Sequence, residues 1–211
     1  MHLQKSLAVL ALAASVLPLS AQAGDAGTGY AQFSSNGLGL GYGKSINADW
    51  AVRGQYNTFK QSFSGDVGDF GAGSTLTVDL NLNSLQVLAD WYPNETGFRV
   101  SGGALINNNK ITVTGTNATV GSATVANVSA DIKMSDTISP YVGIGYSTKP
   151  KDSKGFGFIM DLGVMFQSPK VSISAPGASA ADIAAQEAKV LDAVNKLKTM
   201  PVFGIGVSYS F

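Results

Sequence analysis

The stretch Pro201-Val202-Phe203-Gly204-Ile205-Gly206-Val207-Ser208-Tyr209-Ser210-Phe211, at the C-terminus, alternates strictly between two kinds of side chain. Odd positions from 203 to 211 carry bulky apolar or aromatic residues, whereas even positions from 204 carry only glycine or serine. Successive side chains of a β-strand point to opposite faces, so this stretch predicts a strand with one apolar face and one nearly bare face. An outward face of this kind suits a strand that closes a barrel in contact with lipid.

Seven further segments of the chain are predicted to be strands. Six of them carry apolar side chains at every second position and small or polar ones between them, and these are 37–46, 50–57, 76–91, 98–106, 138–146 and 156–167. A barrel needs an even number of strands, and residues 28–33, before a tight turn at 34–37, can supply the remaining one. Inside 76–91 the phase of the alternation slips between Leu82 and Leu85, which predicts a β-bulge. Together with 201–211 they predict an all-β fold, an eight-stranded antiparallel up-and-down transmembrane β-barrel.

The connections between these segments fall into two length classes. Those at 47–49, 93–96 and 147–154 are short and polar, whereas those at 64–73, 115–126 and 174–200 are longer. Alternating short and long connections are typical of outer-membrane barrels, in which the short turns face the periplasm. Aromatic residues gather at the strand ends beside the short turns and predict a girdle at the membrane interface: Tyr42, Trp50, Trp91, Tyr146 and Phe156.

One segment of the last long connection has a helical rather than a strand period. Residues 180–198 place Ile183, Val190, Val194 and Leu197 along one side of a helix, and Ser179 precedes them as an N-cap. We therefore predict an amphipathic helical insertion at about 179–198. Its apolar stripe must be covered by the barrel mouth, by lipid headgroups or by a partner.

Residues 1–23 have the pattern of a cleaved signal peptide. Lys5 supplies a positive charge, residues 7–17 form an apolar run, and Ala21-Gln22-Ala23 matches the small-x-small cleavage rule. This apolar run is too short for a membrane-spanning helix, which needs about 20 residues. We therefore expect an exported mature barrel domain of residues 24–211. The sequence has no cysteine, so we expect neither disulfides nor a lipid-bearing cysteine.

Composition argues against several functional classes. Removing Lys5 from the 14 basic residues leaves 13 against 14 acidic ones, a formal charge of −1, and no basic cluster is visible along the sequence. Nucleic acid is therefore not an expected partner. The single histidine, His2, lies in the predicted signal peptide. Histidine-dependent catalysis, cysteine nucleophiles and histidine metal sites are thus not expected, and we predict no enzyme activity, metal or cofactor.

Four charged residues are predicted to point into the barrel. The only arginines, Arg53 and Arg99, fall on lumen-facing positions, as do Asp90 and Asp161. The interior of an eight-stranded barrel is just wide enough for side chains, and charges buried there need partners. We predict a structural polar network among these four. The alternative is an acid–base site built on Asp90, Asp161 or Asp79.

The chain resembles the small bacterial outer-membrane barrels of the OmpA-barrel, OmpX and OmpW kind. The resemblance is carried by Pro140-Tyr141-Val142-Gly143-Ile144-Gly145-Tyr146 and by the ending 202–211. It implies a Gram-negative outer-membrane protein, assembled with the barrel-assembly machinery and periplasmic chaperones, that contacts outer-membrane lipid and lipopolysaccharide and is a monomer. In this resemblance the ending is a β-signal for assembly, formed by Phe203, Ile205, Val207, Tyr209 and Phe211.

Three functional hypotheses remain open at this point. The first is a non-enzymatic outer-membrane barrel with a structural or surface role. The second is a narrow pore, in the manner of OmpW, for small or hydrophobic solutes, which bilayer conductance would reveal. The third is a soluble periplasmic barrel that binds a lipophilic ligand, with its apolar faces turned inward. Recovery in the soluble fraction without detergent would favour the third.

Overall fold

The computed structural model describes residues 27–66, 75–94, 96–120, 123–134, 138–148 and 154–211. The predicted signal peptide, residues 1–23, lies outside these ranges. Within them, no helix combines the length and the apolar character needed to cross a membrane.

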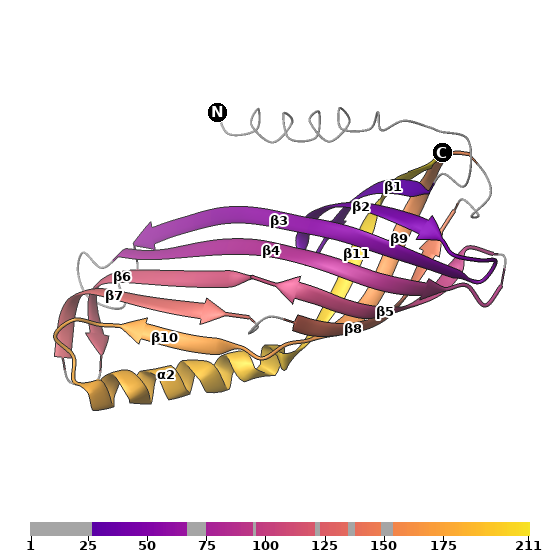
Figure 1. Cartoon of the computed structure of the whole chain (residues 1–211). Helices are drawn as coiled ribbons and strands as arrows, with labels where there is room; N and C mark the ends of the chain where they lie inside the picture. The colour runs from indigo at the N-terminus through magenta and orange to yellow at the C-terminus, as the bar shows by residue number, and fades with distance from the viewer. Residues whose placement is uncertain (1–26, 67–74, 95, 121–122, 135–137, 149–153) are drawn as a thin grey trace, which may run out of the picture.

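Eight antiparallel strands close into a barrel (Figure 1). In ring order they are β1 (Thr28–Ser34), β2 (Gly37–Ser45), β3 (Trp50–Asp66), β4 (Thr75–Trp91), β5 (Phe98–Asn107), β8 (Ile138–Ser147), β9 (Gly155–Phe166) and β11 (Thr199–Ser210). Pairing of β11 with β1 completes the ring, and each strand runs antiparallel to its neighbours. The predicted eight-stranded up-and-down barrel is therefore confirmed.

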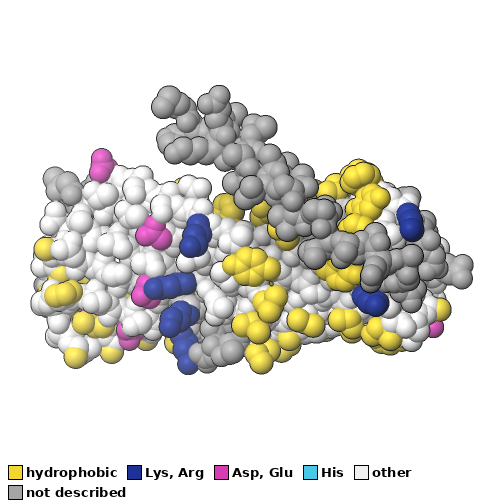
Figure 2. Space-filling model, turned by 45° about the horizontal axis from the view of Figure 1, so that its top comes forward, with side chains coloured by type: hydrophobic (Ala, Val, Ile, Leu, Met, Phe, Trp, Pro, Cys, Tyr) yellow, Lys and Arg dark blue, Asp and Glu magenta, His cyan; other side chains and the backbone are white. Residues whose placement is uncertain are grey.

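The alternation in the sequence becomes an inside and an outside of the barrel. On β11, Phe203 and Ile205 are 59% and 58% exposed on the outer face, whereas Ser208 and Ser210 are buried. The other strands add similarly exposed side chains to an apolar belt, among them Tyr42, Val52, Tyr56, Leu85, Val87, Ile106, Ile138, Ile144, Phe158, Leu162, Phe166 and Val207. On the face that Figure 2 shows, apolar side chains are concentrated over the barrel half of the molecule, and smaller apolar patches lie near the tip of the other half.

Three more strands extend the sheet beyond one end of the barrel. They are β6 (Lys110–Val120), β7 (Ala123–Lys133) and β10 (Lys170–Ser174). β6 pairs with residues 76–81 of β4, β7 pairs with β6, and β10 pairs with β7. With the outer halves of β3 and β4 they form what we call the extension, which projects away from the barrel end that carries the C-terminus (Figure 1). The described part of the predicted connection 115–126 is thus largely strand rather than loop.

Strand β4 is regular over its whole length, so the predicted bulge is wrong. Its pairing with β3 runs without interruption from Thr75 to Trp91. The apolar residues change face because their surroundings change: Leu85 and Val87 face outward in the barrel, whereas Val78 pairs with Phe63 on the lumen-side face of the extension. A slip in the hydrophobic pattern therefore marks where the strand leaves the barrel.

The predicted helix near the C-terminus is confirmed as α2 (Ala180–Val194), which continues into the 3-10 turn η2 (Asn195–Lys198). Ser179 caps it by accepting a hydrogen bond at Oγ from the backbone N–H of Asp182, at 3.1 Å. The helix lies along β10, and Glu187 Oε1 accepts the backbone N–H of Ile173 at 2.7 Å. It thereby occupies the open edge of the extension, where an unpaired strand would be prone to aggregation.

Candidate functional site in the barrel lumen

Four charged side chains from four strands meet inside the barrel. Arg53, Asp90, Arg99 and Asp161 all occupy inward positions and are at most 9% exposed. Arg53 Nη2 and Arg99 Nη2 both lie 2.8 Å from Asp161 Oδ1. Asp90 Oδ2 lies 2.8 Å from Arg53 Nε and 3.8 Å from Arg99 Nε. The structure thus brings together the four residues of the predicted network, with two positive and two negative charges.

Neutral side chains complete this charge cluster. Gln32 Nε2 donates to Asp161 Oδ2 at 2.8 Å, and Ser101 Oγ donates to Asp90 Oδ1 at 2.5 Å. Arg53 Nη1 also donates to Asp161 Oδ2 at 3.0 Å, which makes that pair bidentate. Buried charges are tolerated when each has an opposite partner and further hydrogen bonds, and both conditions hold here. Both carboxylates are engaged by arginine, an arrangement that favours a structural role over acid–base chemistry.

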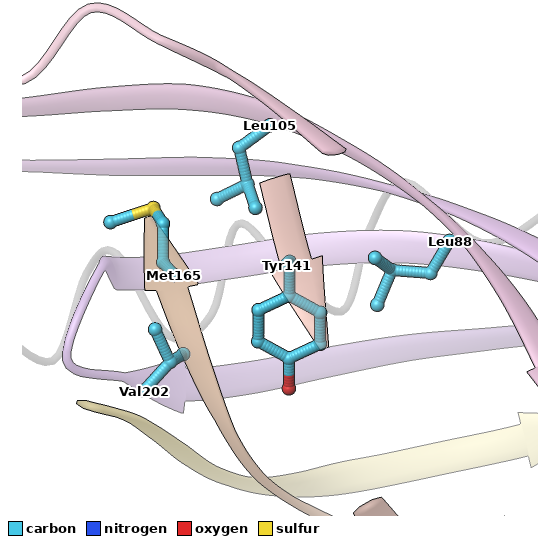
Figure 3. Packing of buried hydrophobic residues seen from close by; sticks show 5 residues of the cluster. All are labelled: Leu88, Leu105, Tyr141, Met165 and Val202. Carbon is cyan, nitrogen blue, oxygen red and sulfur yellow. The ribbon is translucent and has the colours of Figure 1, made fainter. Parts of the chain in front are cut away.

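An apolar layer crosses the lumen next to the charge cluster. It contains Leu88 of β4, Leu105 of β5, Tyr141 of β8, Met165 of β9 and Val202 of β11. Figure 3 shows these side chains converging from different strands. Leu105 and Met165 are 0% exposed, so the layer leaves no solvent in contact with them. The sequence interpretation missed it because these residues sit singly at lumen positions that are otherwise small or polar.

A polar layer follows on the side of the extension. Asn57 Nδ2 donates to Ser84 Oγ at 3.2 Å. Asn107 Nδ2 lies 3.3 Å from Ser139 Oγ and 3.2 Å from Gln167 Oε1. Asn57, Ser84 and Ser139 are completely buried. Charged, apolar and polar side chains therefore fill the described lumen in three successive layers.

Glycines in the barrel wall make room for this filling. A β-carbon on Gly145 would lie 2.7 Å from Cζ of Arg99, and one on Gly163 would collide with the Tyr141 hydroxyl. At Gly102, whose position faces outward, a β-carbon would meet nothing within 4 Å. The lumen glycines are thus required by the bulky side chains that oppose them.

Replacing Gly145 by valine is expected to destabilise the barrel by about 1–3 kcal/mol, because the new side chain displaces Arg99 from its carboxylates. The matched change, Gly102→Val, adds the same side chain on the outer face and is expected to leave stability unchanged or slightly raised. Denaturant unfolding of both variants in detergent or vesicles checks the difference. Equal effects would contradict a tightly filled lumen.

The predicted interface aromatics all lie on the outer face of the barrel, at the end that carries the C-terminus. Their exposed fractions lie between 42% and 77%, for Tyr42, Trp50, Trp91, Tyr146 and Phe156. Trp50 and Trp91 are direct cross-strand neighbours, and the Phe156 and Tyr209 rings meet edge-on with centroids 5.0 Å apart. The five aromatic residues are therefore placed as a girdle at a membrane interface requires.

Phe203, Ile205, Val207 and Tyr209 of the predicted assembly signal occupy alternate positions on one face of β11, and Phe211 directly follows the strand. Phe203, Ile205 and Val207 are more than half exposed. The ring centroids of Tyr209 and Phe211 are 5.1 Å apart, and the backbone N–H of Phe211 donates to Gly27 at 3.2 Å. Recognition of these residues during assembly stays a prediction.

Asp79, the third carboxylate of the predicted alternative acid–base site, does not lie in the lumen with Asp90 and Asp161. Asp79 lies on the extension, where it accepts a hydrogen bond from Ser62 Oγ and pairs across strands with Thr112. It therefore does not join Asp90 and Asp161 in a shared site. Among the residues that the structure describes, no three His, Cys, Asp or Glu side chains come together as a metal site.

Comparison with solved structures finds the same architecture elsewhere. The crystal structure of Acinetobacter baumannii CarO2 aligns with a TM-score of 0.60 and 22% identity, over 88% of this chain and 98% of that one. The fold is that of small eight-stranded outer-membrane barrels. Acinetobacter baumannii CarO aligns with a TM-score of 0.59 and 22% identity, over 91% and 100% of the two chains.

Ail of Yersinia pestis aligns more loosely, with a TM-score of 0.40 and 14% identity over 88% of this chain and 96% of that one. Neither the protein-family models nor the curated proteins include a match to the chain. The comparisons confirm the predicted resemblance at the level of the fold.

Proposed function

We propose that the protein is an integral barrel of the bacterial outer membrane, with a closed lumen and a structural or surface-binding role rather than a catalytic one. One observation carries this proposal: the outer face of the barrel is apolar while its interior is filled by ion-paired and hydrogen-bonded side chains. A solvent-exposed apolar belt of this extent is unfavourable in water and favourable in lipid.

The orientation of the two faces argues against a soluble barrel with an internal lipophilic ligand. Such a barrel needs apolar side chains inside, but Arg53, Asp90, Arg99 and Asp161 occupy that space. The outer face, where a soluble barrel needs polar groups, carries side chains such as Phe158, which is 64% exposed. Membrane fractionation with heat-dependent gel mobility tests the location. Recovery in the soluble fraction without detergent would overturn it.

The filled lumen argues against the narrow-pore hypothesis. Passage along the axis must cross the layer around Leu105 and Met165, which are fully buried, and then the ion-paired cluster. An ion in that cluster would have to break pairs that hold buried charges. If the lumen is closed, a surface-binding role falls to the outside of the molecule, including the extension and its helix.

We expect the purified protein in planar bilayers to show no conductance steps. The double variant Leu105→Gly/Met165→Gly removes two side chains of the apolar layer and is expected to raise the frequency of small steps. Single-channel recording on both proteins checks this result. Regular steps from the unaltered protein would favour the pore.

A further inference from the structure

Four lysines from four strands form one row across the outer face of the extension. Lys60 of β3 pairs with Asn81 of β4, which pairs with Lys110 of β6, and Lys110 is followed by Lys133 of β7 and Lys170 of β10. Adjacent strands are about 4.8 Å apart, so the row spans about 19 Å. We call these four residues the lysine row. Lys60, Lys133 and Lys170 are exposed and Lys110 is half-buried.

The lysine row places like charges at opposed positions of neighbouring strands. Lys110 lies directly opposite Lys133, and Lys133 lies directly opposite Lys170. Like charges at directly opposed positions destabilise a sheet, because they face each other across the shortest distance between strands. Asp131 offsets part of this repulsion through its ion pair with Lys110, and a partner that brings negative charge to the row reduces it further.

The lysine row has a fixed position relative to the apolar belt. Lys60 follows the exposed Tyr56 by four residues, Lys110 follows Ile106 by four, and Lys170 follows Phe166 by four. Figure 2 shows the same relation on the surface, with basic side chains in a band between the apolar side chains and the polar half of the molecule. The row therefore marks the edge of the belt on the side of the extension.

The distances match those of a lipid headgroup. Four residues of strand rise about 13 Å, or about 10 Å along the barrel axis for a strand tilted by about 40°. The headgroup zone is about 5–8 Å deep on each side of the hydrocarbon core. A lysine stem can cover the remaining distance by folding back along the strand toward the belt.

Acidic side chains lie two residues farther along the strands, on the side of the lysine row away from the belt. Asp79 and Asp131 both face Thr112 across strands in the next outward-facing row, and Asp131 Oδ2 lies 3.0 Å from Lys110 Nζ. Hydrogen bonds from Lys110 and Thr112 lower the pKa of Asp131, so its carboxylate is charged at neutral pH. Positive charge thus stands next to the belt and negative charge beyond it, an order that attracts anionic headgroups and limits how deep the extension sits.

We propose that the lysine row binds the phosphate groups of lipids in the leaflet that surrounds the belt. This inference rests on the membrane location proposed above. The ligand is a membrane phosphate held by several ammonium groups at once, with its acyl chains against the apolar belt. The contact orients the extension on the membrane surface and makes the protein sensitive to the phosphate content of its leaflet.

The test compares lipid A that carries its phosphates with dephosphorylated lipid A, by native mass spectrometry of the detergent-solubilised protein. The double variant Lys60→Gln/Lys133→Gln removes two ammonium groups and leaves the Lys110–Asp131 pair intact. At roughly fivefold per lysine, its affinity for the phosphorylated lipid is expected to fall about 25-fold at low salt. The control variant Lys44→Gln/Lys189→Gln removes two exposed lysines outside the row and is expected to bind as the unaltered protein does.

Binding by the unaltered protein is also expected to weaken as salt rises, because exposed charges are screened. Unchanged preference for the phosphorylated lipid in the Lys60→Gln/Lys133→Gln variant would overturn the inference. Displacement of the lipid by inorganic phosphate at equal concentration would overturn it as well, because the row would then be a site for soluble anions. Failure of the unaltered protein to enter vesicles, with no heat-dependent gel mobility, would instead refute the membrane location.

Discussion

Replacing Arg99 by methionine is expected to lower the free energy of unfolding by about 3–5 kcal/mol, the largest effect of any substitution considered. Arg99 is 1% exposed, and its guanidinium lies 2.8 Å from Asp161 and 3.8 Å from Asp90. Without it, Arg53 alone faces two buried carboxylates, and one negative charge is left uncompensated in the lumen. Denaturant unfolding of the refolded protein in vesicles measures the loss.

A second variant separates lost charge balance from lost packing. In Arg99→Met/Asp90→Asn the cluster is again neutral, and the bidentate Arg53–Asp161 pair is retained. Most of the lost stability is expected to return, because an ion pair removed as a whole costs far less than one partner removed alone. A double variant no more stable than Arg99→Met would mean that the cluster acts through shape alone.

The barrel could be predicted from sequence because its two environments differ so strongly. The outer face of the barrel is apolar and its interior is narrow, so apolar side chains stand at every second position with small or polar ones between them, as in Phe203-Gly204-Ile205-Gly206. The same alternation put Arg53, Asp90, Arg99 and Asp161 on inward positions. Their distances depend on strand register, which the pattern of a single strand does not contain.

The extension was not predicted because it lacks this contrast. β6 and β7 are rich in Thr, Val and Ala, and their side chains do not alternate between bulky apolar and small or polar types as those of the barrel strands do. The lysine row could not be predicted from the sequence for a related reason. Its members are separated by 23 residues or more along the chain, from Lys110 to Lys133, and become neighbours only through pairing of β6, β7 and β10. A sequence search for basic clusters finds contiguous runs and misses rows across a sheet.

Replacing Leu162 by arginine is expected to cost about 2–4 kcal/mol, because it places a charge in the lipid-facing belt near its middle. Leu162 is 58% exposed on β9, between Ile144 of β8 and Phe203 of β11, and its neighbours offer no carboxylate on that face. The side chain points away from the lumen, so the charge cluster around Asp161 is unaffected. The loss should appear in unfolding titrations in lipid and be smaller in a detergent that lets water reach the belt.

The control places the same charge on the same side of the sheet but beyond the belt. Ser172 of β10 is exposed and occupies the row of Asp131, next to the lysine row. Ser172→Arg is expected to change stability by less than about 0.5 kcal/mol, as exposed substitutions usually do. The difference between the two arginines therefore reports where lipid ends along the molecule. Equal costs would show that the belt is not the membrane-facing surface, whereas a cost confined to Leu162→Arg sets the lipid boundary between Leu162 and Ser172.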